Sequence, residues 1–204
     1  MKYTGTLQVT TPSDREIRLT RVFDAPRRLV FQALSKPALI RRWWGLKSLV
    51  MTVCEMDLRV GGSWRFVLRD PDGQEHPFKG VYKEIVAPER IIQTFIYDVE
   101  GIRDHPAIET LTLEEQDGRT VFTSTVLHEL KEARDGHLAS GMEPGATESY
   151  NRLEDLMCEV DVAREVQARL LPRTRPTARS LRRSCWRPSW QTSFGFQAVC
   201  NRTT

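Results

Sequence analysis

The fold of this chain is decided by residues 59–95, which read RVGGSWRFVLRDPDGQEHPFKGVYKEIVAPERIIQTF. Trp64, Phe66 and Leu68 recur at every second position, which is the period of a strand with one apolar face. The turn sequence Asp-Pro-Asp-Gly follows at residues 70–73 and combines the preset φ of proline with a glycine that tolerates positive φ. Two more strand-like runs complete the segment. We therefore predict an antiparallel meander at the centre of the fold.

The segments on either side of the meander supply the helices and the remaining strands. Asp24 is a candidate capping residue for a first helix, and Pro144 can open a long last helix. Asp-Gly at residues 117–118 lies between two alternating runs and predicts a hairpin. The predicted order is a strand (16–23), two short helices (from residue 24, and 38–44), a strand (51–58), the meander, a hairpin (108–113 with 120–127), a polar connection (128–142) and the long helix.

This order predicts an α+β fold, because an antiparallel sheet is followed and preceded by helices that cover one of its faces. Glycines at residues 61–62 and at Gly80 favour strong curvature of the sheet. A curved sheet wrapped around the long C-terminal helix is a helix-grip arrangement, and we expect it to leave a cavity between sheet and helix. The helix should face the sheet with one apolar stripe, made of Ala146, Ser149, Tyr150, Leu153, Leu156, Met157 and Val160.

Composition divides the chain into a polar lead-in (1–14), one domain (15–164) and a basic tail (165–204). The tail holds eight Arg, no Lys and one acid, whereas the whole chain has a net charge of only +3, so the domain is mildly acidic. We therefore expect no nucleic-acid partner for the domain. We interpret the tail as disordered sequence read through a frameshift or a missed stop codon, since it is rich in Arg, Pro, Ser and Trp. The alternative is a genuine arm that binds single-stranded nucleic acid or an anionic membrane.

Two absences in the sequence bear on localisation. There is no run of about 18 apolar residues, so we expect no membrane span. The first residues lack the apolar core of a secretory signal, so we expect a cytoplasmic protein.

The four cysteines are scattered without a C-x-x-C pair: Cys54, Cys158, Cys185 and Cys200. We therefore expect free thiols, no metal and no other cofactor.

Six short motifs occur in order over residues 15–160. They are FDAPR (23–27), RWWG (42–45), DLRVGGSWR (57–65), GVY (80–82), PERI (88–91) and GM (141–142). In these motifs the chain resembles the START-like helix-grip (SRPBCC) superfamily. More narrowly, it resembles bacterial homologues of the C-terminal domain of the co-chaperone that activates the ATPase of heat-shock protein 90.

The resemblance implies the strand and helix order given above, together with a hydrophobic cavity. Members of the wider superfamily carry lipids, hormones or polyketides, and a few are cyclases or hydrolases, whereas the eukaryotic co-chaperone uses a similar domain to bind protein. The resemblance implies no fixed set of catalytic residues. Leu46 replaces the usual proline, and the basic tail extends past the usual end of the family.

Nine side chains are candidates to line the cavity. A tryptophan pair before Gly45 can plug the end of the sheet or roof a ligand, and alternating aromatic residues on inward strand positions serve as both core and cavity wall. The candidate ligand-binding residues are Trp43, Trp44, Trp64, Phe66, Tyr82, Phe95, Tyr97, Tyr150 and Leu153.

The polar residues do not form a convincing catalytic set. Glu55 and Asp57 share one face of a strand, and we interpret them as a salt-bridged or solvated face beside Arg59 rather than an acid–base pair. Simple alternation in the same strand places Met51 and Cys54 on opposite faces. The four histidines have no metal-ligand spacing, and we expect solvated positions for them: His76, His105, His128 and His137.

We therefore expect a non-enzymatic domain, monomeric or homodimeric, that binds a small hydrophobic molecule or a protein partner in or beside its cavity, in a stress response. One alternative is an enzyme of the polyketide cyclase, aromatase or hydrolase kind. Another is a co-chaperone-like module that activates an ATPase.

Overall fold

The computed structural model describes residues 6–170 of the chain, and their side chains as far as residue 160. Eight strands form one antiparallel sheet in the order β1-β2-β8-β7-β6-β5-β4-β3. The strands are β1 (Gln8–Thr10), β2 (Glu16–Phe23), β3 (Val50–Met56), β4 (Ser63–Arg69), β5 (Glu75–Val86), β6 (Arg90–Tyr97), β7 (Ala107–Gln116) and β8 (Arg119–Leu127). The helices are α1 (Arg27–Ser35), α2 (Pro37–Trp43), α3 (Lys131–Ala139) and α4 (Met142–Leu170).

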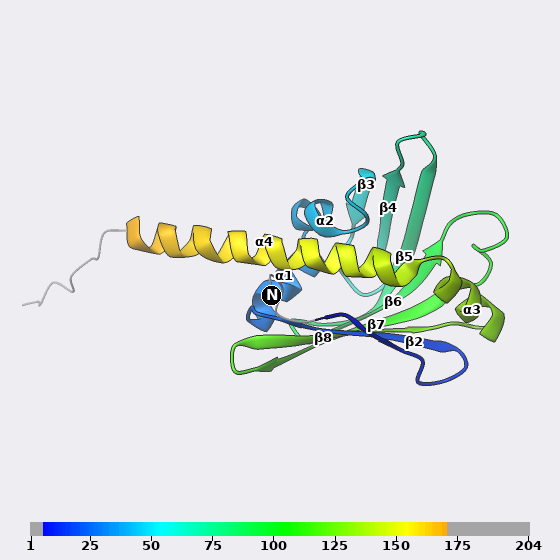
Figure 1. Cartoon of the computed structure of the whole chain (residues 1–204), viewed down its shortest axis with the longest axis horizontal. Helices are drawn as coiled ribbons and strands as arrows, with labels where there is room; N and C mark the ends of the chain where they lie inside the picture. The colour runs from blue at the N-terminus through cyan, green and yellow to red at the C-terminus, as the bar shows by residue number, and fades with distance from the viewer. Residues whose placement is uncertain (1–5, 171–204) are drawn as a thin grey trace, which may run out of the picture. The chain divides into compact units, whose positions relative to one another are not determined.

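The helices lie on the inner side of the curved sheet (Figure 1). α4 runs along this side, with α1 and α2 beside it and α3 near its N-terminus. The hydrophobic core fills the space between, and it draws on α1, α2, α4 and the inward faces of the strands. The predicted α+β helix-grip fold is confirmed.

Two turns, one in the meander and one in the last hairpin, form as the sequence predicts. Asp70 Oδ1 accepts the backbone N–H of Asp72 at 3.0 Å and that of Gln74 at 2.8 Å, so one carboxylate closes the β4–β5 turn. In the β7–β8 hairpin, Asp117 and Gly118 both have positive φ, at 51° and 77°. Positive φ at both central residues is the geometry that gives a two-residue hairpin the twist of its strands.

One register prediction was wrong, because β3 contains a bulge. The pairing of β3 with β4 shifts between Met51 and Val53, which inserts one extra residue into β3. A bulge reverses the alternation of the residues that follow it. Met51, Cys54 and Met56 therefore all pack against the core, although the sequence placed Met51 and Cys54 on opposite faces.

The N-terminus of α1 is capped from another strand rather than by Asp24. The N-cap residue is Pro26, and Asp24 instead lies 3.4 Å from Arg119 Nε at the hairpin. The backbone N–H of Arg27 donates to Glu115 Oε2 at 2.8 Å. Glu115 thus supplies a carboxylate to a helix N-terminus, where free N–H groups favour negative charge.

Two elements were not predicted. β1 lies within the expected lead-in and pairs with β2. α3 occupies the expected polar connection, and its only buried residue is Arg134, so it has no apolar period to detect. The predicted basic tail lies outside the described residues, except that α4 continues to Leu170.

The apolar stripe of α4 packs on the sheet as predicted, and it includes an ion pair that the sequence did not indicate. Tyr150, Leu153 and Met157 are at most 8% exposed. Glu154, in the same stretch, is 5% exposed and accepts a hydrogen bond from Arg21 Nη2 at 2.7 Å. Because Arg21 is on β2, this buried pair links α4 to the half of the sheet that contains β1, β2, β8 and β7.

Candidate functional site

A continuous group of aromatic side chains covers the inner face of β4, β5 and β6. Strand register brings them together, because Phe66 pairs with Phe78 across β4–β5 and Phe78 pairs with Tyr97 across β5–β6. The ring centroids of Phe78 and Tyr97 are 4.8 Å apart, and those of Trp44 and Phe78 are 5.0 Å apart. We call this group the aromatic wall: Trp44, Trp64, Phe66, Phe78, Phe95 and Tyr97.

The wall is covered unevenly. Trp64 and Phe66 are 2% and 6% exposed, whereas Trp44, Phe78 and Phe95 keep intermediate exposure although they face the interior. Tyr97 is also only partly buried. Aromatic rings that face the interior but are not fully covered offer apolar area to a ligand.

Beside the wall lies a carboxylate held by two neutral donors. Glu109 Oε2 accepts a hydrogen bond from Gln93 Nε2 at 2.7 Å, and Glu109 Oε1 accepts one from Ser124 Oγ at 2.8 Å. Glu109 shares the inward face of β7 with Leu111 and Leu113, which are both buried in the core. Burial raises the pKa of the Glu109 carboxyl, while the two hydrogen bonds act to lower it.

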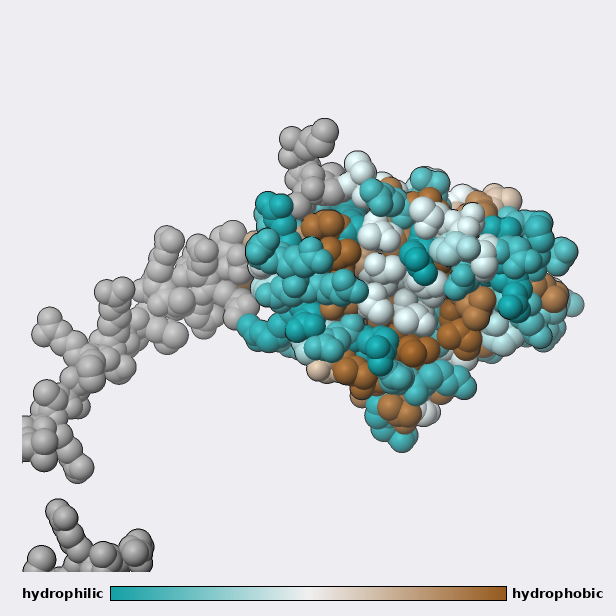
Figure 2. All heavy atoms as spheres, turned by 90° about the horizontal axis from the view of Figure 1, so that it is seen from below, coloured by the Kyte–Doolittle hydropathy of each residue, from teal (hydrophilic) through white to brown (hydrophobic). Residues whose placement is uncertain are grey.

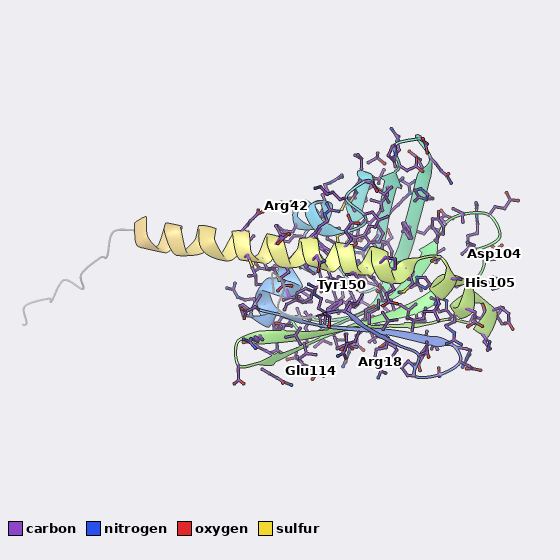
Figure 3. The ribbon with its side chains drawn as sticks, viewed as in Figure 1. Arg18, Arg42, Asp104, His105, Glu114 and Tyr150 are labelled. Atoms are coloured by element: carbon purple, nitrogen blue, oxygen red, sulfur yellow. The ribbon has the colours of Figure 1, made fainter. Side chains whose placement is uncertain are left out.

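Two tyrosines flank this carboxylate. Tyr82 is the direct partner of Gln93 across β5–β6, and Gln93 is the direct partner of Glu109 across β6–β7, so Tyr82, Gln93 and Glu109 form one row across three strands. Tyr150 lies between α4 and the sheet (Figure 3). Burial raises the pKa of both phenols, and the charge of Glu109 raises it further, so both hydroxyls stay protonated near neutral pH.

A histidine pair closes one side of the wall. His128 Nε2 and His137 Nδ1 are 3.1 Å apart, and the His137 ring is stacked with Phe95 at a centroid distance of 6.4 Å. Burial lowers the pKa of His128, as does Arg134, and burial and His128 lower the pKa of His137 to about 4. The expectation of solvated positions was wrong for these two histidines, because they pack against each other and His137, on α3, stacks on Phe95.

On the other side of the wall, His76 Nδ1 lies 2.8 Å from the hydroxyl of Tyr97, and His76 Nε2 lies 3.3 Å from Asp70 Oδ2. His105, in contrast, is an exposed residue of the β6–β7 loop (Figure 3). The interpretation of Asp57 as a salt-bridged surface residue is confirmed, since its Oδ2 accepts a hydrogen bond from Arg59 Nε at 2.7 Å. Glu55 is exposed.

The nine predicted cavity residues fall into three groups. Five of them belong to the aromatic wall, and Tyr82 and Tyr150 lie near Glu109. Trp43 and Leu153 are core residues at 4% and 0% exposure, and Trp43 Nε1 donates to the carbonyl oxygen of Ala33 at 3.0 Å. Phe78 and Glu109 were not predicted from the sequence. The signal for Glu109 was a carboxylate on the inward side of an otherwise apolar alternation from Ala107 to Leu113.

No group of three or more potential metal-ligating side chains occurs within residues 6–160. No helix in the described part of the chain is long and apolar enough to cross a membrane.

Residues 24–157 match the family model described as Activator of Hsp90 ATPase homolog 1-like protein. The chain belongs to this family. The Activator of Hsp90 ATPase homolog 1-like family lies within the START-like helix-grip superfamily, so the predicted family is confirmed. A comparison with curated proteins gave no match.

Solved bacterial structures share the fold of this Activator of Hsp90 ATPase homolog 1-like domain. A Rhodobacter sphaeroides protein is 27% identical with a TM-score of 0.69, covering 75% of this chain and 98% of that one. A Chromobacterium violaceum protein is 29% identical with a TM-score of 0.60, covering 71% and 98%. The AHSA1 protein of Silicibacter pomeroyi, at 22% identity and a TM-score of 0.56, covers 74% and 99% and resembles this chain in fold.

Proposed function

We propose that this domain binds a small, largely apolar molecule against the aromatic wall, without catalysing a reaction on it. The observation that carries the proposal is the partial exposure of Trp44, Phe78, Phe95 and Tyr97 on the interior face of the sheet. Fully covering one large apolar side chain contributes about 1.5–3 kcal/mol, so a ligand that completes the cover of two or three rings gains at most about 3–9 kcal/mol, which corresponds to binding in the millimolar to micromolar range. Small-molecule sites of this kind are mostly apolar with a few polar groups that set orientation.

Two measurements test the proposal. Native mass spectrometry of the full chain purified from its host should detect a bound small molecule. In vitro, the neutral fluorophore prodan should bind, and Phe95→Ala should weaken binding roughly tenfold, which corresponds to about 1.4 kcal/mol of lost contact.

Val81→Ala is the matched control, because Val81 is 36% exposed and lies on β5 among residues of the opposite face. Equal prodan affinity in the wild type and the Phe95→Ala variant would contradict binding at the wall.

An enzymatic role keeps one supporting feature, since Glu109 is an inward titratable group with polar partners in hydrogen-bond reach. Conversion of a bound molecule to product would favour that alternative.

A co-chaperone role is a second candidate, supported by the description of the family. The surface that would serve it is the outer face of β7 and β8, where Thr110 pairs with Thr125 and Thr112 with Thr123. Figure 2, seen from below the sheet, presents a mixed surface with small hydrophobic groups among polar residues. Stimulation of a chaperone ATPase by the full chain, lost on replacing Thr112 and Thr123 by Arg, would support this role. An unchanged ATPase rate with the wild-type chain would count against it.

A further inference from the structure

Glu109 is a partly buried carboxylate on the inward face of β7, and no positive charge is paired with it among the described residues. Its two oxygens accept hydrogen bonds from Gln93 and Ser124, which are both neutral. No Lys, Arg or His of the described residues forms an ion pair with it. A buried carboxylate that lacks a cation is unfavourable, because neutral hydrogen bonds replace only part of its lost hydration. A ligand that brings a positive charge to Glu109 would therefore be favoured.

The surroundings of Glu109 suit an organic cation better than a metal ion. Phe95 lies on the same inward face of β6 as Gln93 and two residues away, next to the row that holds Glu109. Aromatic faces attract cations electrostatically, and the hydroxyl oxygen of Tyr82, which stays protonated and neutral, can accept a hydrogen bond from an N–H group. A metal ion would require more oxygen ligands than one carboxylate supplies.

The spacing of the strand positions sets the length of the molecule. Phe95 and Gln93 are separated by one inward step along β6, and such a step is about 7 Å. A ring over Phe95 and Phe78 would thus place an ammonium group at Glu109 if a chain of about two carbons joined them.

We propose, building on the function proposed above, that the domain binds a protonated arylalkylamine whose ring packs on the aromatic wall and whose ammonium group pairs with Glu109. An aryl acid of the same length would bring a second negative charge to Glu109 and should be rejected. An aryl alcohol would keep the ring contact and lose the ion pair.

The test compares three matched probes on the full chain by isothermal titration calorimetry at neutral pH: 2-phenylethylamine, 2-phenylethanol and phenylacetate. The amine should bind at least roughly tenfold more tightly than the alcohol, and the acid should bind more weakly than either. This ranking needs no variant, so it does not depend on a substitution that could disturb folding.

Two isosteric variants then locate the charge. Glu109→Gln should reduce the affinity for the amine to that for the alcohol and leave the alcohol unchanged. Glu114→Gln is the matched control, because Glu114 is exposed on the same strand and projects from the outer face (Figure 3). It should leave all three affinities unchanged.

Equal binding of amine and alcohol, or preference for the acid, would overturn the proposed ligand class. The proposed ligand class is also overturned if none of the three probes binds at up to about 10 mM while prodan still binds at the wall. In that case the proposed function stands. If neither the three probes nor prodan binds, both proposals fail together.

Discussion

Gly80→Ala should destabilise the domain strongly, because the sheet has no room for a side chain at this position. A Cβ built on Gly80 would collide with the carbonyl oxygen of Thr94 and would lie 2.5 Å from Trp64 Nε1. Gly80 is the direct partner of Trp64 across β4–β5, so the indole lies over the glycine. Neither obstacle can move cheaply, since one is backbone of β6 and the other is a side chain only 2% exposed.

The expected cost is about 3 kcal/mol. Overpacking a close-packed interior costs about 1–3 kcal/mol, and loosening the β5–β6 pairing forfeits about 0.5–1.5 kcal/mol for each hydrogen bond lost. That cost is a large share of the roughly 5–15 kcal/mol by which a domain of this kind is stable. Urea unfolding followed by far-ultraviolet circular dichroism measures the change as a lower midpoint.

Gly136→Ala is the matched control for the same chemical change. A Cβ at Gly136 would meet nothing within 4 Å, and the residue lies inside α3. Alanine should stabilise α3 there by about 0.5–1 kcal/mol because of its higher helix propensity. A loss below about 1 kcal/mol for Gly80→Ala would refute the reasoning, since it would mean that β6 and Trp64 yield easily.

Three further predictions concern charge. The pKa of His137 lies below its usual 6.5, at about 4, so the unfolded chain takes up the proton at a higher pH than the folded chain. The stability contributed by neutral His137 should be full above pH 6.5 and should fall by about 2 kcal/mol as the pH drops toward 4. The variant His137→Gln, with His128 unchanged, should reduce that loss when urea unfolding is measured as a function of pH. Glu115→Ala should cost about 0.5–1.5 kcal/mol by freeing an amide of α1, and an unchanged thermal midpoint would contradict this. Asp57→Asn should change stability by less than about 0.5 kcal/mol, because its pair with Arg59 is exposed; a larger loss in the same unfolding assay would mean that the pair has a structural role.

The sequence predicts those features of the fold that depend on neighbouring residues. The alternation through Trp64 and Phe66 determines which side of β4 is inward, and Asp117-Gly118 determines the tightness of the last hairpin. Both signals are read within a few residues of the chain. The strand β2 and the apolar stripe of α4 were predicted for the same reason.

The features that escaped prediction depend on residues that are distant in the chain. Glu115 caps α1 from 88 positions away, and Ser124 meets Glu109 only because β7 and β8 pair in one register. The bulge in β3 is a property of its pairing with β4 and has no mark in its own sequence. Five of the six residues of the aromatic wall were predicted as cavity-lining candidates, but the carboxylate beside them requires three strands to be aligned at once.

The sheet remains open, with β1 and β3 at its margins, and the form of those margins limits how copies of this protein can meet. β1 offers only three residues, and β3 is interrupted near Thr52. Short and bulged margins are poor templates for an added strand from another chain. The domain can therefore keep an open sheet and still resist the edge-to-edge growth that leads such sheets to aggregate.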